Sequence, residues 1–128
     1  MKVIVRGKAE GAVLKTEIPI NFLGSVDKKT GVISDDKHDL VGRHVGDSIL
    51  VFPYGVGSSV GAYTIYSLKS NKAAPKAMVC KKADITVASG CALANIPLVI
   101  LSEEEYGMLY NGRHVLLDTD SKTLKVVS

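Results

Sequence analysis

The chain has 128 residues, of which 46% are hydrophobic, and this is enough for one ordinary domain with a real core. Its 16 basic and 13 acidic residues leave a formal net charge of +3, an excess too small and too scattered to predict nucleic-acid binding. There is no N-terminal signal pattern and no long apolar run. We therefore expect a single domain over residues 1–128 in a cytoplasmic protein with reduced thiols.

The cysteines and histidines bear on metal binding. Cys80 and Cys91 lack CxxC spacing and are too few to hold an iron–sulfur cluster alone. The three histidines, His38, His44 and His114, show no metal-ligand spacing with each other. We expect no metal site in this chain, so another chain would have to supply most ligands of any metal that takes part.

The first third of the chain has the composition of short strands separated by turns. Apolar runs broken by glycine and proline favour strands over helices. Extended segments are expected at 2–7, 12–15 and 18–22. Residues 24–31 then have turn composition, with Asp27 able to bond the backbone two residues on and Gly31 free to take a positive φ.

Residues 34–46 are the most charged part of the chain and surround a thin apolar thread. Such a segment is either a ligand-binding loop or a solvated connection, and composition leaves both open. His38, which lies among aspartates, is its most notable residue.

Residues 49–80 have the pattern of strand, loop, helix and strand. Four apolar residues run into Pro53, and an apolar stripe at i, i+4 and i+7 predicts a helix over 59–70. The short apolar run 76–80 is typical of a buried strand. Because strand–helix–strand units normally make parallel, right-handed crossovers, we expect the two strands to be parallel.

The remaining chain continues the mixed pattern. Small residues in 83–95 predict a loop and a short, closely packed helix, and 96–101 is another core strand. Ser102 has the capping-box form and predicts a helix over 103–110. A closing hairpin is expected from residues 114–117 and 124–127.

The loop between the first strand and helix of the 49–80 unit is where we expect chemistry. Gly55 and Gly57 allow conformations that a side chain would block and let a ligand approach closely. The helix start that follows offers unsatisfied N–H groups and partial positive charge, which would hold a carboxylate or phosphate and ease deprotonation of a serine. Ser58 and Ser59 are therefore candidates for a ligand contact or a base. The alternative is structural, because serine is also among the commonest helix N-caps.

Two familiar motifs are missing from this loop. Gly57 is followed by Ser58 where a phosphate-binding loop GxxxxGK[ST] would have lysine, so nucleoside triphosphate use is not indicated. No GxSxG elbow occurs, so a Ser-His-Asp triad is also poorly supported.

The arginines and cysteines offer further candidates. Arg6, Arg43 and Arg113 are the only arginines, and Arg6, beside a glycine at a strand end, is the best placed to bind an anionic substrate. Surface ion pairing is the alternative for each of them. Cys80 and Cys91 are expected to be buried small hydrophobes rather than nucleophiles.

Several segments together resemble a known family. They are residues 6–11 (RGKAEG), 22–31 (FLGSVDKKTG), 55–61 (GVGSSVG), 83–85 (ADI) and 96–98 (IPL). In this order they resemble the small subunit of the aconitase X family over nearly the whole chain. The match is far more specific than the Gly-Ser-Ser element alone.

The resemblance implies a β-rich α/β fold, a swivelling β/β/α domain equivalent to the mobile domain of aconitases. This domain would close over a large subunit that carries a [4Fe-4S] cluster. The implied reaction is dehydration of (R)-5-phosphomevalonate to trans-anhydromevalonate 5-phosphate in an archaeal mevalonate pathway for isoprenoid biosynthesis. By the same resemblance, Ser58, the first serine after the glycine loop, is the proton acceptor. This chain then supplies half of an active site that it shares with the large subunit.

One departure from aconitases concerns substrate binding. Aconitases follow the two serines with an arginine that grips a substrate carboxylate, whereas this chain has Val60. The anion would then be held by other groups of this chain or by the partner. The expected substrate contacts here are Ser59, Gly57, Gly55 and Arg6. Dehydration of another hydroxy acid, such as a hydroxyproline-like substrate, and a non-catalytic anion-binding module remain the alternatives.

Overall fold

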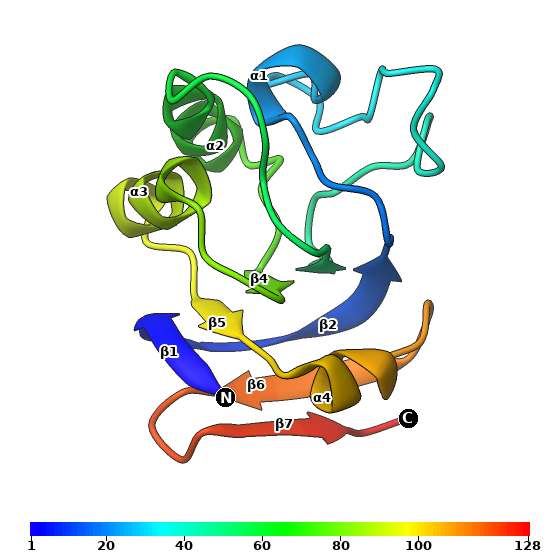
Figure 1. Ribbon diagram of the computed structural model, residues 1–128, viewed down its shortest axis with the longest axis vertical. Coiled ribbons are helices and arrows are strands. Elements are labelled where there is room, and N and C mark those ends of the chain that lie inside the picture. The colour runs from blue at the N-terminus through cyan, green and yellow to red at the C-terminus, as the bar shows by residue number, and fades with distance from the viewer.

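Seven strands form one sheet in the order β1-β5-β4-β3-β2-β6-β7 in the computed structural model, which describes residues 1–128 (Figure 1). The strands are β1 (Lys2–Val5), β2 (Lys8–Lys15), β3 (Ile49–Val51), β4 (Ala77–Cys80), β5 (Leu98–Ile100), β6 (His114–Asp118) and β7 (Thr123–Val126). The helices are α1 (Phe22–Ser25), α2 (Gly61–Ser70), α3 (Ile85–Ala94) and α4 (Glu103–Gly107). No helix has both the length and the apolar character needed to span a membrane.

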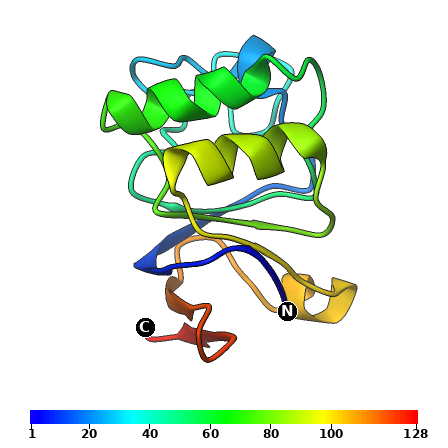
Figure 2. The same ribbon diagram turned by 90° about the vertical axis from the view of Figure 1, so that its left-hand side faces the viewer.

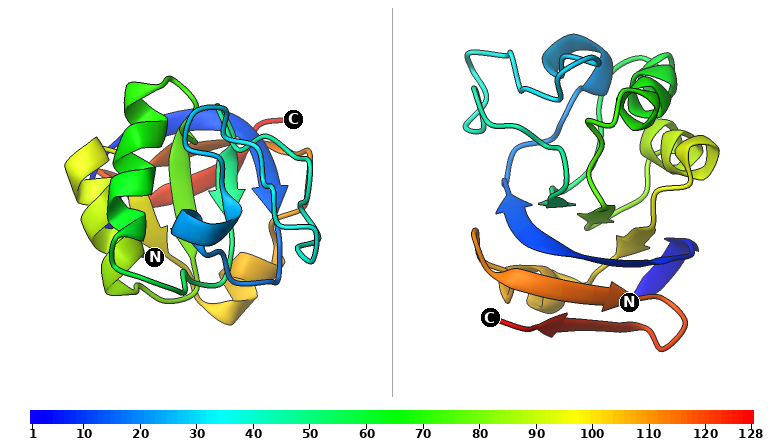
Figure 3. Two further views of the ribbon diagram at one scale, coloured as in Figure 1. Left: turned by 90° about the horizontal axis from the view of Figure 1, so that it is seen from above. Right: turned by 180° about the vertical axis from the view of Figure 1, so that it is seen from behind.

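The long strand β2 joins two parts of the sheet. Its first five residues pair with β6 in antiparallel register, and its last three pair with β3 in parallel. Strands β2, β3, β4 and β5 are parallel to one another, whereas β1, β6 and β7 join them in antiparallel pairs. Figure 3 shows β2 as a curved ribbon that leads from the parallel strands to β6 and β7, so the sheet is a half-barrel.

Two apolar cores separate three layers. One core of 19 buried residues lies between the parallel strands and helices α1, α2 and α3. A second core of 12 buried residues lies on the opposite face, under β6 and α4, and includes Tyr106. Figure 2 shows α2 and α3 side by side above the parallel strands, with β6 and β7 beneath these strands. This β/β/α layering confirms the fold predicted from the sequence.

Most predicted elements are present. Strands β3 and β4 are parallel and flank α2, as the crossover rule requires. The turn before position 32 is also confirmed: Asp27 accepts hydrogen bonds from the N–H groups of Lys29 and Thr30, and Gly31 has φ +78°. These backbone hydrogen bonds lower the pKa of Asp27.

One predicted strand is absent and several element boundaries differ from the prediction; β1, for example, ends at Val5 rather than 7, and β2 begins at Lys8 rather than 12. Residues 18–22 form no strand: Ile20 makes one isolated bridge to Gly55, and Phe22 already begins α1. Helix α2 begins at Gly61, two residues later than predicted, and α4 ends at Gly107 rather than 110. The N-cap of α1 explains the missing strand: the Asn21 side chain accepts a hydrogen bond from the Gly24 N–H, so the extended segment ends and a helix begins.

The parallel strands define two edges with different contents. Loops that follow β2, β3, β4 and β5 all leave from the carboxyl edge, where α2 and α3 begin. The helices end at the opposite, amino edge, where β2 also starts. In sheets with parallel strands, ligands normally bind at the carboxyl edge.

Candidate active-site loop

The loop from Phe52 to Val60 carries the glycines and serines singled out in the sequence. Gly57 adopts φ +95°, in the region that side chains rarely enter. A Cβ atom at Gly57 would lie 2.6 Å from Oδ1 of Asn21, the residue that caps α1. Glycine is therefore required here for two reasons, conformation and space.

Gly55 has a structural role in this loop. Its N–H donates to Oδ1 of Asp84 at 2.8 Å, and a Cβ at this position would lie 2.6 Å from Cγ2 of Val87. Asp84 also caps α3, since its other oxygen accepts the Val87 N–H at 3.2 Å. Since the Gly55 N–H is already occupied, the structure does not offer it as the substrate contact expected from the sequence.

Three consecutive backbone N–H groups in the loop remain unused. Val56 donates to the Ile20 carbonyl at 3.0 Å, but the N–H groups of Gly57, Ser58 and Ser59 have no acceptor within the chain. All three residues are exposed. Successive free N–H groups at a turn attract anions, as does the start of a helix such as α2.

Neither serine caps α2. The N-cap position is Val60, which has helical dihedral angles and no side-chain cap. The Ser58 Oγ accepts the Val60 N–H at 3.1 Å, while the Ser59 hydroxyl makes no hydrogen bond within the chain. Ser58 therefore makes a local bond of the kind expected from the structural alternative, whereas Ser59 makes none, and both residues are exposed.

Exposed apolar side chains surround this loop. Val56 and Val60 lie on the loop itself and are 43% and 49% exposed. Leu23 of α1, Tyr63 of α2 and Ile85 of α3 are 49%, 67% and 78% exposed. We call these five residues the apolar collar. Gly61, the first residue of α2, lies against Phe22 and Leu23 of α1 and Thr86 of α3, so the collar residues of these helices lie near the end of the loop.

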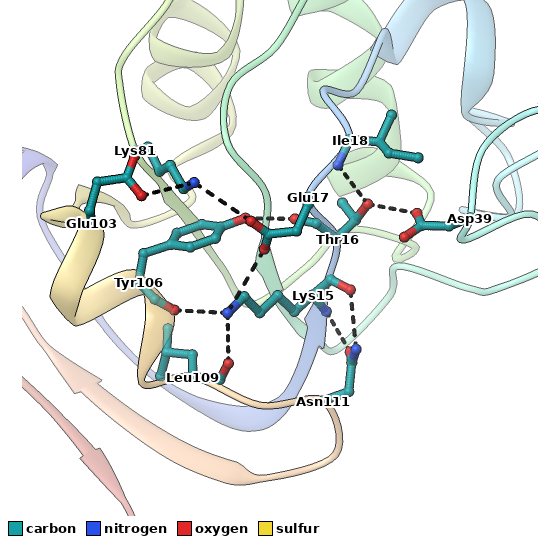
Figure 4. A network of polar contacts seen from close by, with 10 residues as sticks. All are labelled: Lys15, Thr16, Glu17, Ile18, Asp39, Lys81, Glu103, Tyr106, Leu109 and Asn111. Carbon is teal, nitrogen blue, oxygen red and sulfur yellow. Dashed lines mark hydrogen bonds and ion pairs between the residues drawn. The ribbon is translucent and has the colours of Figure 1, made fainter.

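A polar network stabilises the same edge of the sheet (Figure 4). Tyr106 of α4 donates its hydroxyl to the Thr16 carbonyl at 2.6 Å, and burial raises the pKa of Tyr106. Lys81 lies 4.6 Å from the Tyr106 ring centroid and pairs with Glu17 at 3.6 Å and Glu103 at 3.2 Å. The hydrogen bond to Glu103 raises the pKa of Lys81. Lys15 also pairs with Glu17 at 3.9 Å, so two lysines balance Glu17 and Glu103 in this network.

Arg6 is not brought to the loop. It follows β1, whose antiparallel pairing with β5 places its last residue at the amino edge, opposite Ser58. Its guanidinium pairs with Asp120 at 2.8 Å, and this hydrogen bond raises the pKa of Arg6. Arg6 therefore has the surface ion pair that was the alternative to a substrate contact.

The side chains of this chain do not fit an iron–sulfur cluster. Cys80 and Cys91 are fully buried in the core, and burial raises the pKa of Cys91 to about 12. No group of three or more His, Cys, Asp and Glu side chains is placed to hold a metal ion. His38 is buried too, with its Nδ1 accepting the Leu40 N–H at 3.1 Å.

Sequence reasoning missed the role of Asp84. An aspartate before a predicted helix is an N-cap signal, so its bond within α3 could have been predicted. Its bond to Gly55 could not, because 29 residues separate the two in the sequence and only the sheet brings them together.

The loop 52–60, which we call the serine loop, lies at the carboxyl edge of the sheet. Together with the layered fold it defines a swivelling domain of the aconitase type. A 3-isopropylmalate dehydratase structure (LeuD) from Methanocaldococcus jannaschii shares this fold, with a TM-score of 0.68 at 14% identity over 94% of this chain and 76% of that one. The family model described as aconitase X swivel domain matches residues 1–126. The chain belongs to the aconitase X swivel domain family.

Individual relatives are similar over nearly their whole length. The chain is 45% identical over 118 residues to the phosphomevalonate dehydratase small subunit of Methanosarcina mazei, covering 91% of this chain and 82% of the relative. For the same subunit of Thermococcus kodakarensis the identity is 42% and the shares are 97% and 92%. The crystal structure of Thermococcus kodakaraensis aconitase X in its holo-form superimposes with a TM-score of 0.93 at 41% identity, covering 99% and 95% of the two chains.

Proposed function

We propose that this chain is the small subunit of a two-subunit hydro-lyase that converts (R)-5-phosphomevalonate to trans-anhydromevalonate 5-phosphate, with Ser58 as the base. The observation that carries the proposal is the exposed Ser58 hydroxyl between free N–H groups and the start of α2. The similarity to small subunits named phosphomevalonate dehydratase supports the reaction class.

The loop supplies what proton abstraction needs from this chain. Ser58 Oγ, as the alkoxide, takes the proton from the carbon beside the substrate carboxylate. The electron pair of that C–H bond forms the C=C bond, and the hydroxyl on the next carbon leaves. The Val60 N–H already donates to Ser58 Oγ at 3.1 Å, and the positive end of α2 adds to its stabilisation of the negative oxygen. Ser59 and the free N–H groups at 57–59 hold the substrate.

The large subunit completes this site in the proposal. In the proposal it carries the [4Fe-4S] cluster, in keeping with the side chains of this chain, which do not fit one. The apolar collar gives the two subunits a surface on which to close around Ser58, since exposed apolar groups that surround a functional loop are typical of an interface. The chain alone is then inactive.

The direct test is to assay the chain alone, the large subunit alone and the two together, with (R)-5-phosphomevalonate as substrate. The proposal predicts dehydration only in the mixture. Turnover by the isolated chain, or turnover of a hydroxyproline in place of phosphomevalonate, would contradict it. Strong binding of inorganic phosphate by the isolated chain in calorimetry would favour an anion-binding module instead.

A further inference from the structure

A hollow of about 450 Å³ opens at the carboxyl edge, next to the first residues of the serine loop. It is lined by Glu17, Pro19, Pro53, Tyr54, Lys81, Lys82 and Glu103. These residues follow β2, β3, β4 and β5, so the hollow lies on the same edge of the sheet as Ser58.

The two lysines in the hollow differ in their partners. Lys81 pairs with both glutamates of the hollow, Glu17 and Glu103. Lys82 has no carboxylate within ion-pair distance and is exposed. Lys15, next to the hollow, also pairs with Glu17 at 3.9 Å. Lys15 and Lys81 together balance the two glutamates, so the positive charge of Lys82 has no carboxylate partner.

Both the backbone and the side chain of Lys82 contact the loop 52–60. Its backbone N–H donates to the Pro53 carbonyl at 3.3 Å, alongside the Lys81 N–H at 2.9 Å. Its ammonium lies 4.4 Å from the centroid of the Tyr54 ring, and Tyr54 immediately precedes Gly55. A cation–π contact of this kind restricts a flexible lysine without neutralising it. The bond from Gly55 to Asp84 ties the same two loops together a second time.

We infer that Lys82 binds the phosphate of the substrate while Ser58 faces the carbon that loses its proton. This inference rests on the proposed function, which gives the substrate a phosphate at the end opposite its carboxylate. A phosphate monoester carries a charge of about −1.5 to −2 at neutral pH and three acceptor oxygens, and lysine binds such a group as a point charge. Val60, next to the serines, offers no cation, so Lys82 supplies this charge from the neighbouring loop.

The test uses the complex with the large subunit in a Ser58→Ala background, so that substrate binds without turning over. Calorimetry measures the Kd of phosphomevalonate with and without Lys82→Gln. Loss of a charge-assisted hydrogen bond to phosphate raises this Kd roughly 10- to 100-fold. Lys82→Arg keeps the charge and restores most of the affinity. The Kd of mevalonate, which lacks the phosphate, does not change with Lys82→Gln.

A matched control is Lys76→Gln, which removes the same charge from an exposed lysine at the amino edge and leaves both affinities unchanged. An unchanged Kd for phosphomevalonate in Lys82→Gln would overturn the inference, and so would an equal loss of affinity for mevalonate. The proposed function is judged separately, by turnover in complexes that keep Lys82. Undiminished turnover in Ser58→Ala would refute the base, whatever Lys82 does to binding.

Discussion

Two serines stand at helix starts in this fold, and the chain uses them differently. Ser102 caps α4: its Oγ accepts the Glu105 N–H at 3.2 Å, and the Glu105 carboxylate accepts the Ser102 N–H at 3.0 Å. Ser58 stands two residues ahead of Val60, the N-cap of α2, and its Oγ accepts only the Val60 N–H, at 3.1 Å. Ser102 takes part in a reciprocal pair of bonds, whereas Ser58 accepts a single bond, is exposed and has an N–H without an acceptor.

This difference separates a structural serine from a candidate catalytic one without reference to the rest of the chain. A capping box satisfies two orphan N–H groups reciprocally, so nothing remains for a ligand. The glycine loop before α2 does the opposite, because Gly57 turns the backbone so that the N–H groups at 57–59 meet no acceptor. A loop that leaves polar groups free at a helix start is suited to bind an anion.

The largest effect is expected from Ser58→Ala. Removing a general base lowers turnover by roughly 10² to 10⁴-fold in the complex with the large subunit. Ser59→Ala should lower turnover less, because that hydroxyl contacts substrate without taking the proton. Co-purification of both variants with the large subunit shows whether assembly is intact. Ser58→Ala that assembles and keeps most of its turnover would remove the distinction between the two serines.

Gly57→Ala should destabilise the loop itself. Alanine at φ +95° costs about 1–3 kcal/mol in strain, and its Cβ would also press on the Asn21 side chain. Thermal unfolding of the chain measures the loss, and the assay of the complex should show lower turnover. Gly112→Ala is the matched control, because Gly112 has φ +84° but open space around it. It should lose about 1–2 kcal/mol of stability and no activity.

Ser102→Ala should have the opposite effect to Ser58→Ala: it should lower the stability of the chain and leave turnover of the complex unchanged. Loss of an N-cap lowers the free energy of unfolding by about 1 kcal/mol, while turnover of the complex stays at the wild-type level. Denaturant unfolding of the chain provides the measurement. If Ser102→Ala lowered turnover as far as Ser58→Ala, the two helix starts would not differ in the way described.

The smallest effect is the pH dependence of the α4 start. The backbone hydrogen bond from Ser102 holds the pKa of Glu105 below its ordinary value of 4.5. A lowered carboxyl pKa in the folded state contributes stability above 4.5, and this contribution is lost as pH falls through the folded value. The stability difference between wild type and Glu105→Gln should therefore shrink as pH falls below 4.5. A difference that stays constant from pH 7 to pH 3 would contradict this.

Local patterns predicted much of this structure, because short apolar runs, the capping box and the glycine loop are encoded over a few residues. The short helix α1 was missed because the apolar run at 18–22 favours a strand, and the Asn21 cap overrides it. The position of Arg6 could not be predicted because a strand end can lie at either edge of a sheet, and only the antiparallel pairing of β1 decides which.

The candidate site was predictable only in part for the same physical reason. Gly57, Ser58 and Ser59 are adjacent, so their spacing already indicated an anion-binding turn. The contacts of Gly55 with Asp84 and of Tyr54 with Lys82 join loops far apart in the sequence. Such contacts follow from the order of the parallel strands, which no local pattern contains.

The most direct test of the central claim is exchange of the carbon-bound proton, because it reports the step assigned to Ser58. Complexes incubated with phosphomevalonate and its dehydration product in D₂O should incorporate deuterium at the carbon beside the carboxylate, as followed by NMR. We predict that Ser58→Ala abolishes this incorporation, whereas Ser102→Ala leaves it at the wild-type rate. Incorporation at the wild-type rate in the Ser58→Ala complex would contradict the assignment of Ser58 as the base.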